Sequence, residues 1–175
     1  MILRILIVVA LVIAAVLLFA ATKPGTLNIQ RAVVINAPPE RVFTLINDLH
    51  NWKDWGPEEK ADKTVTYSFS GSPSGIGAAS EWDSRGSAGK GQMMITESEP
   101  AKRVAVKVDF VKPFASHNLN EFTLEPAGPS TLVTWSWQGQ NLYFMKVMGV
   151  FVSMDKMIGS HFDSGLQNLK AIAEK

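Results

Sequence analysis

Few side chains in this sequence have the residue types and the spacing that catalysis needs. The chain has no cysteine, which excludes disulfides, thiol nucleophiles and thiolate metal ligands. No two of its three histidines have the i, i+4 spacing of a helical metal site. No acid–base pair can be placed in the predicted interior, so we expect neither a metal nor a cofactor. The weak catalytic candidates are Asn118, Asn120, Asp155 and His161.

Three polar residues share the faces of predicted strands with large apolar residues. Ser80 has the same parity as Trp82, while Asn118 and Asn120 have the same parity as Phe122. A buried amide or hydroxyl needs a hydrogen-bond partner, so these groups are candidates to bind a ligand head group or a trapped water. The alternative for Asn118 is an exposed position at the start of its strand.

Aromatic residues dominate the face that carries these polar groups. Trp52 and Trp55 follow the first predicted helix of the domain, where they either line a cavity mouth or close the end of the core. Methionines near the C-terminus favour a cavity because they adapt to irregular ligand surfaces, although methionine also fills gaps in a solid core. The expected lining of the cavity is Trp52, Trp55, Ser80, Trp82, Met93, Ile95, Val106, Val108, Phe110, Asn118, Asn120, Phe122, Trp135, Trp137, Met154, Ile158 and Phe162.

The elements that must position these residues change their period along the chain. A strand is expected over 27–36 and a helix after the prolines at 38–39, and the charged run Glu58 to Lys63 predicts a solvated loop. Turns every 8 to 12 residues then separate alternating runs, as in an antiparallel meander. From Val147 to Ile172 apolar residues recur at steps of four and three, which predicts a long amphipathic helix with Gly149 or Gly159 as a bend site. The expected class is α+β, with a curved antiparallel sheet of six to seven strands around a long C-terminal helix.

The N-terminal segment has the composition of a membrane helix. No polar side chain interrupts the run from Ile5 to Ala21, and a helix over residues 1–21 is about 31 Å long, close to the hydrocarbon thickness of a bilayer. We expect a transmembrane anchor over 1–22, a linker over 23–26 and a soluble domain over 27–175, with an uncleaved or cleaved signal as the alternative. Arg4 and the short leading tail favour an outward-facing domain, whereas Lys23 and Arg31 oppose it.

Charge excludes one class of partner. The chain has 17 basic and 16 acidic residues, and Arg4 precedes the apolar run, so the soluble part is formally neutral. A neutral domain without a basic stripe lacks the electrostatic footprint of a nucleic-acid-binding protein. The expected partners are the membrane, through the N-terminal helix, and a small molecule rather than a nucleic acid.

A series of motifs covers nearly the whole chain after Thr26. They are Ile35 to Phe43, Asn51-Trp52-x-x-Trp55-x-Pro57, Gly75-x-Gly77, Trp82, Gly89 to Glu97, Thr131-x-Val133-Thr134-Trp135 and Asp155 to Lys170. With the element order, these motifs resemble the helix-grip (SRPBCC) superfamily of birch-pollen-allergen-like, START-type and polyketide cyclase/dehydrase-like domains, and most closely its membrane-anchored cyclase-like members. The resemblance implies a deep cavity between the sheet and the last helix that can hold an apolar or amphipathic molecule.

Anchor, aromatic interior and missing acid–base pair together favour a membrane-tethered carrier of a hydrophobic small molecule or lipid. The alternative is a cyclase- or dehydratase-like enzyme that acts on a polyketide-like or other apolar substrate without metal or cofactor. A third interpretation is an envelope protein that only contacts partners, which a solid interior would favour.

Overall fold

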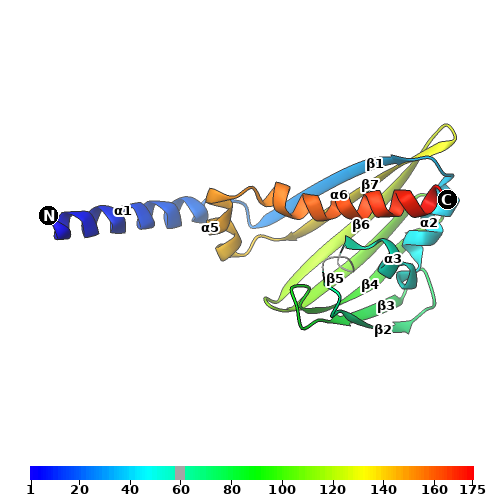
Figure 1. Ribbon diagram of the computed structural model, residues 1–175, viewed down its shortest axis with the longest axis horizontal. Coiled ribbons are helices and arrows are strands. Elements are labelled where there is room, and N and C mark those ends of the chain that lie inside the picture. Colours follow the sequence, from blue (N-terminus) through cyan, green and yellow to red (C-terminus); the bar gives the residue numbers. More distant parts are fainter. Residues whose placement is uncertain (58–61) are drawn as a thin grey trace.

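A long apolar helix, α1, extends from the domain in the computed structural model, which describes residues 1–57 and 62–175 (Figure 1). An 18-residue window of this 20-residue helix has a mean hydropathy of 3.2, which is apolar enough to cross a membrane, although a signal sequence passes the same test. The described elements are α1 (Ile2–Ala21), β1 (Thr26–Ile35), α2 (Pro39–Asn47), the 3-10 turn η1 (Leu49–Asn51), α3 (Trp52–Trp55), β2 (Thr66–Gly71), β3 (Ala78–Asp83), β4 (Lys90–Glu99), β5 (Arg103–Lys112), β6 (Ser116–Ala127), β7 (Ser130–Gln140), α5 (Tyr143–Phe151) and α6 (Met154–Ala173).

The strands form one antiparallel sheet of seven in the order β1-β7-β6-β5-β4-β3-β2, which confirms the predicted fold class. Strands β2 to β7 are a meander, and β1 closes onto β7 at the far edge. Register shifts in β4 at Lys90/Gly91 and at Ile95/Glu97 add local twist. Such bulges bend a sheet, and the sheet curves around α6 in Figure 1.

Helix α6 lies along β1 and is fixed to it by a cluster of ionic contacts (Figure 1). The Arg31 guanidinium is 2.9 Å from the Asp155 carboxylate and 3.3 Å from that of Asp163, and it also donates to the Asp155 carbonyl. Gly159 lies between the two acids, and a Cβ on it would be 1.9 Å from Arg31 Nη2. The glycine therefore serves close packing of helix on strand.

The C-terminal helical region is two helices, so the expectation of one long helix bent at Gly149 or Gly159 was wrong in its detail. The chain becomes extended at Val152 (φ −127°, ψ 139°), and Ser153 then caps α6 by accepting from the Lys156 amide. Gly149 lies within α5 and Gly159 within α6. The break separates α5, which packs on α1, from α6, which packs on the domain.

Candidate ligand-binding interior

The register of the sheet brings the predicted cavity residues into neighbouring rows on the face under α6. One row runs through Ser80, Met93, Val108 and Asn118, because β3, β4, β5 and β6 pair at those positions. The next row contains Ile95, Val106, Asn120 and Trp137, and a third contains Trp82 and Phe110 on either side of Gly91. The inner face thus combines aromatic, aliphatic and neutral polar side chains.

One half of this interior, beside α3 and the C-terminal half of α6, is filled by aromatic rings. Trp135 stacks on Phe162 with ring centroids 4.4 Å apart and lies 4.8 Å from Phe122. Trp55 is fully buried, contacts the rings of Phe122 and Trp135, and donates from Nε1 to the Leu45 carbonyl. Trp52 is half-buried beside it, 4.9 Å away. In this half the sheet and the helices pack in direct contact.

The other half is less completely covered. Met93, Phe110 and Trp137 point to the same face but stay half-buried, as does Ile158 on α6. Trp82, Val108, Phe162 and Met154 also keep a small accessible surface, while Ile95 and Val106 in the next row have none. We call this less completely covered part of the inner face the open half.

Neutral polar groups lie in or beside this open half. The Ser80 hydroxyl is buried and has no hydrogen-bond partner among the described residues. Asn118 Nδ2 donates to Ser116 Oγ (3.2 Å), and Asn120 Oδ1 accepts from Trp135 Nε1 (2.8 Å). Leaving a buried hydroxyl unpaired costs about 1–3 kcal/mol, so Ser80 keeps a hydrogen-bonding group that the described residues do not use.

The four catalytic candidates do not come together. Asn118 and Asn120 are inside, whereas Asp155 and His161 are exposed on α6. The hydrogen bond from Arg31 holds the pKa of the Asp155 carboxyl below its usual value, so this group is an ion-pair partner rather than a proton donor. Among the described residues, Asp62 is the buried acid or base, and its hydrogen bonds are all taken up by the chain itself.

The position of Asp62 corrects the prediction of a solvated loop, while Glu58 to Ala61 lie outside the described residues. Its carboxylate accepts from the Thr64 amide (3.0 Å) and hydroxyl (2.6 Å), from Ser84 Oγ (2.5 Å) and from the Ala88 amide (3.1 Å). These bonds, chiefly those from Ser84 and Thr64, lower the pKa of Asp62. They fix the segment before β2 to the β3–β4 turn, next to the carbonyl of Ala88 that accepts from Trp82 Nε1. The Asp62-x-Thr64 spacing of an Asx turn was the available sequence signal.

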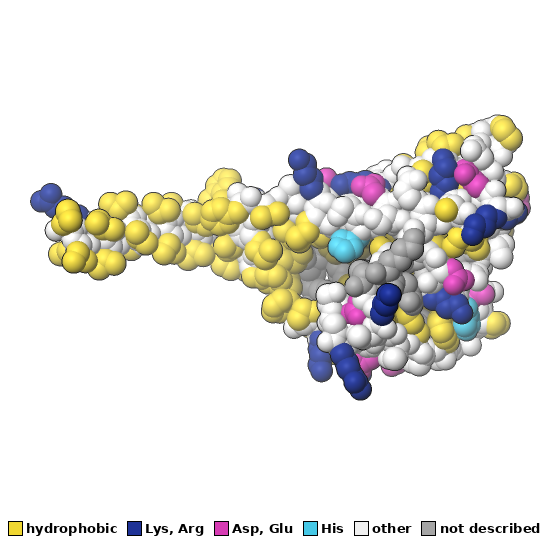
Figure 2. Space-filling view, viewed as in Figure 1, with side chains coloured by type: hydrophobic (Ala, Val, Ile, Leu, Met, Phe, Trp, Pro, Cys, Tyr) yellow, Lys and Arg dark blue, Asp and Glu magenta, His cyan; other side chains and the backbone are white. Residues whose placement is uncertain are grey.

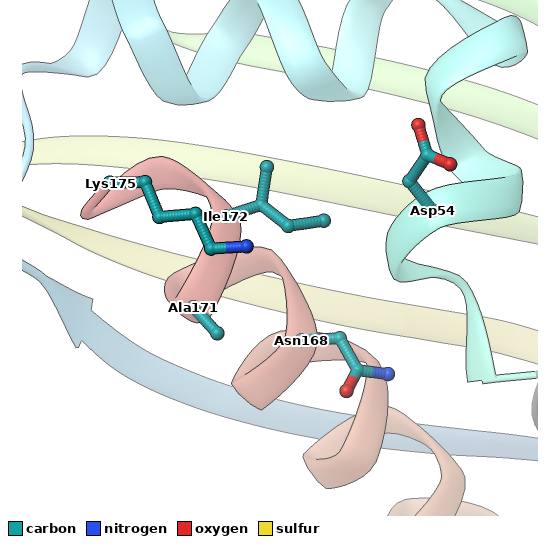
Figure 3. Close-up of a pocket in the computed structure, with 5 residues that line it drawn as sticks. All are labelled: Asp54, Asn168, Ala171, Ile172 and Lys175. Atoms are coloured by element: carbon teal, nitrogen blue, oxygen red, sulfur yellow. The ribbon is translucent and has the colours of Figure 1, made fainter.

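Two pockets formed by described residues lie outside this interior. The larger one, of about 480 Å³, opens between α3 and the end of α6, with Asp54 across from Lys175 and Ile172 (Figure 3). The second, of about 100 Å³, lies across β2 to β5 and is lined mainly by outward side chains such as Glu81, Gln92 and Lys107, although Ser80 and Met93 of the inner-face row also border it. Both are bordered by exposed charged groups, which suit solvent better than an apolar ligand.

Solved structures of low sequence identity have this fold. Protein CV1439 from Chromobacterium violaceum is 18% identical, with a TM-score of 0.61 over 87% of this chain and 99% of that one. The Aha1 dimer from Colwellia psychrerythraea is 20% identical, with a TM-score of 0.56 over 85% and 96% of the two chains. Ara h 8.0201 is 12% identical, with a TM-score of 0.55 over 86% and 96%. At such identities the likeness shows the helix-grip fold alone.

A search of curated proteins found no match. A family model does match, over residues 26–174, which are β1 to the end of α6 and include both halves of the interior. The chain therefore belongs to the family described as polyketide cyclase/dehydrase and lipid transport.

Proposed function

We propose that this protein is a membrane-tethered carrier that binds an apolar or amphipathic molecule, such as a lipid, in the open half of its interior. The observation that carries the proposal is the unpaired Ser80 hydroxyl among half-covered apolar side chains on the inner face. Apolar side chains bind the body of such a ligand by excluding water, and a hydroxyl or amide fixes its neutral polar end. The family description, which includes lipid transport, supports the same class of ligand.

The polar groups on the described part of the inner face favour carriage over chemistry. Near the open half these groups are Ser80, Asn118, Asn120 and the phenol of Tyr67, which pairs with Trp82 across β2 and β3. An amide or a hydroxyl orients a ligand, whereas acid–base catalysis needs a group that titrates near the working pH. The anchor would keep the carrier where apolar molecules partition.

Native mass spectrometry of the full chain, released from detergent after incubation with a lipid extract, tests this function. We expect an added mass that survives detergent removal. Val108→Phe, which adds volume to the open half, should abolish the adduct, and the matched control Leu119→Phe, on the outer face of β6, should keep it. A wild-type chain without any adduct contradicts the carrier.

A cyclase- or dehydratase-like enzyme is the second candidate, favoured by the two inner-face amides and by the first half of the family description. Asn120, whose Oδ1 accepts from Trp135, can donate from Nδ2 to a ligand carbonyl and polarise it, whereas Asn118 Nδ2 donates to Val108 and Ser116. The same experiment separates the two functions, because a carrier releases its ligand with the mass unchanged. Loss of water from the bound molecule, abolished in Asn120→Ala with the melting temperature retained, would establish the enzyme.

A further inference from the structure

Helix α5 exposes an apolar surface that the domain does not cover. Among its nine residues none is buried, and Lys146 is the one charged side chain. Phe151 is 72% exposed, and Tyr143, Phe144, Met148 and the following Val152 are exposed as well. A helix whose apolar residues stay uncovered in a folded chain marks an interaction surface.

The turn between β5 and β6 extends this surface. Phe114 is 54% exposed and its ring lies 4.5 Å from that of Phe144. We call the set Phe114, Tyr143, Phe144, Met148, Phe151 and Val152 the apolar collar. In Figure 2 the hydrophobic surface continues from α1 onto the adjoining end of the domain, where the collar lies.

The collar is fixed to α1 rather than free to move relative to it. Ala20 of α1 is fully buried, the Tyr143 hydroxyl donates to the Leu17 carbonyl (2.9 Å), and Lys23 Nζ donates to the Gly149 carbonyl. The linker is held too, since Asn141 donates from its side chain to the Pro24 carbonyl and from its amide to the Gly25 carbonyl. Helices α1 and α5 therefore form one unit (Figure 1).

This geometry sets the depth of the collar in a bilayer. Leu17 lies four residues before Ala21, which is about 6 Å along a helix. If α1 spans the hydrocarbon layer and Ala21 lies at its boundary, the Tyr143 hydroxyl is about 6 Å inside that boundary. Interfacial helices bury their apolar face to a similar depth, roughly 5–10 Å. The segments 111–115 and 143–152 contain two lysines, Lys112 and Lys146, and no acidic residue, which suits anionic lipid headgroups.

We propose that the apolar collar lies in the interfacial layer of the bilayer that holds α1, so that the domain docks on the lipid surface in one orientation. The proposal rests on α1 being a retained membrane helix, as in the proposed function. Phe110, at the end of the open half, is only four residues from Phe114 in the apolar collar. Docking of the collar would therefore bring this end of the open half close to the membrane. The interior would then open next to the lipid.

The cysteine-free chain allows a direct test by single-site labelling of the full protein. A polarity-sensitive fluorophore is attached to Phe114→Cys and Phe151→Cys, with Val9→Cys in α1 and Ala127→Cys at the opposite β6–β7 turn as controls. The protein is reconstituted in phosphatidylcholine vesicles containing phosphatidylserine. Nitroxide lipids labelled at shallow or deep acyl positions and aqueous iodide serve as quenchers.

We expect shallow nitroxide lipids to quench the labels at 114 and 151, deep ones to quench the label at 9, and iodide alone to reach the label at 127. Iodide quenching at 114 and 151, with position 9 in lipid, overturns docking and leaves a domain tethered at a distance. Protection at 114 and 151 from both quenchers also overturns it, in favour of contact with a second copy. If lipids do not quench the label at 9, α1 is not in the membrane, and docking is overturned as well. Ligand binding is tested separately, by the mass of the adduct.

Discussion

The carboxylate of Asp62 joins two segments that are distant in sequence. It gathers donors from Thr64, which precedes β2, and from Ser84 and Ala88, which lie between β3 and β4. Four donors on two oxygens favour the ionised form, so the pKa of Asp62 is lowered on folding. A group whose folded pKa is depressed stabilises the protein above its unfolded pKa, near 4, and loses that effect as pH falls toward its folded pKa.

We predict that Asp62→Asn lowers the melting temperature most at neutral pH, because an amide cannot accept all four hydrogen bonds. The difference in melting temperature from the wild type should stay constant down to about pH 5 and shrink as the pH falls further, from about 5 to about 2. Thermal unfolding followed by tryptophan fluorescence measures it, with Glu125→Gln, at an exposed position of β6, as the control. A difference in melting temperature between the wild type and Asp62→Asn that stays constant over this pH range would show that the carboxylate acts through its shape and not through its charge.

The inner-face residues could be predicted from sequence where the two-residue period of a strand alone decides which face of the sheet a side chain takes. Ser80, Trp82, Asn118 and Asn120 all lie on the buried face because alternate side chains of a strand point to opposite sides, whatever the strand pairs with. Asp62 was missed because two of its partners, Ser84 and Ala88, lie more than 20 residues away in the chain and only the fold brings them to it. Its charged neighbours in the sequence are typical of a solvated loop, and this local signal outweighed the Asx-turn spacing.

At the scale of elements, close contact between α6 and the sheet depends on small residues in the helix. Gly165 lies against Trp135, and a Cβ there would be 2.8 Å from Trp135 Cζ3 and 3.1 Å from Pro57 Cδ. The sequence predicted the apolar stripe of α6 but not this fit, because a stripe does not reveal which facing side chain each position meets. The break before α6 was missed for a similar reason, since Ser153 resembles any polar helical residue until its cap to Lys156 is seen.

We predict that Gly165→Ala destabilises the protein, although alanine is the better helix former. The helix gains about 1 kcal/mol in propensity, whereas overpacking against a rigid indole costs about 1–3 kcal/mol. The melting temperature should therefore fall, while Ser164→Ala, one position along on the exposed face, should raise it slightly. In a Trp135→Phe background the contacting ring atom is gone, and the penalty of Gly165→Ala should decrease. A rise in melting temperature for the single variant would show that the interior beside α3 is looser than these contacts indicate.

At the scale of the whole molecule, the chain divides into an apolar helical unit, α1 with α5, and the family domain. The division follows the break at Val152 and Ser153, which lets α5 turn toward α1 while α6 continues along β1. Ala20 is the buried residue of α1, and β1 begins only at Thr26, so the sheet and its core do not depend on the anchor. Removing α1 should therefore leave the fold intact and uncover the side of α5 that Ala20 occupies.

We predict that a chain starting at Lys23 folds with a cooperative thermal transition but self-associates as its concentration rises. The reason is that α5 then presents apolar surface on two sides, toward the lost α1 and along the collar. Sedimentation velocity over a concentration series measures this. Phe144→Ser with Phe151→Ser should restore the monomer, whereas Ile76→Ser with Met94→Ser, at exposed apolar positions of the domain, should not. A shortened chain that remains monomeric with α5 unaltered would mean that α5 folds back onto the domain once α1 is absent, and the rigid α1–α5 unit would have to be abandoned.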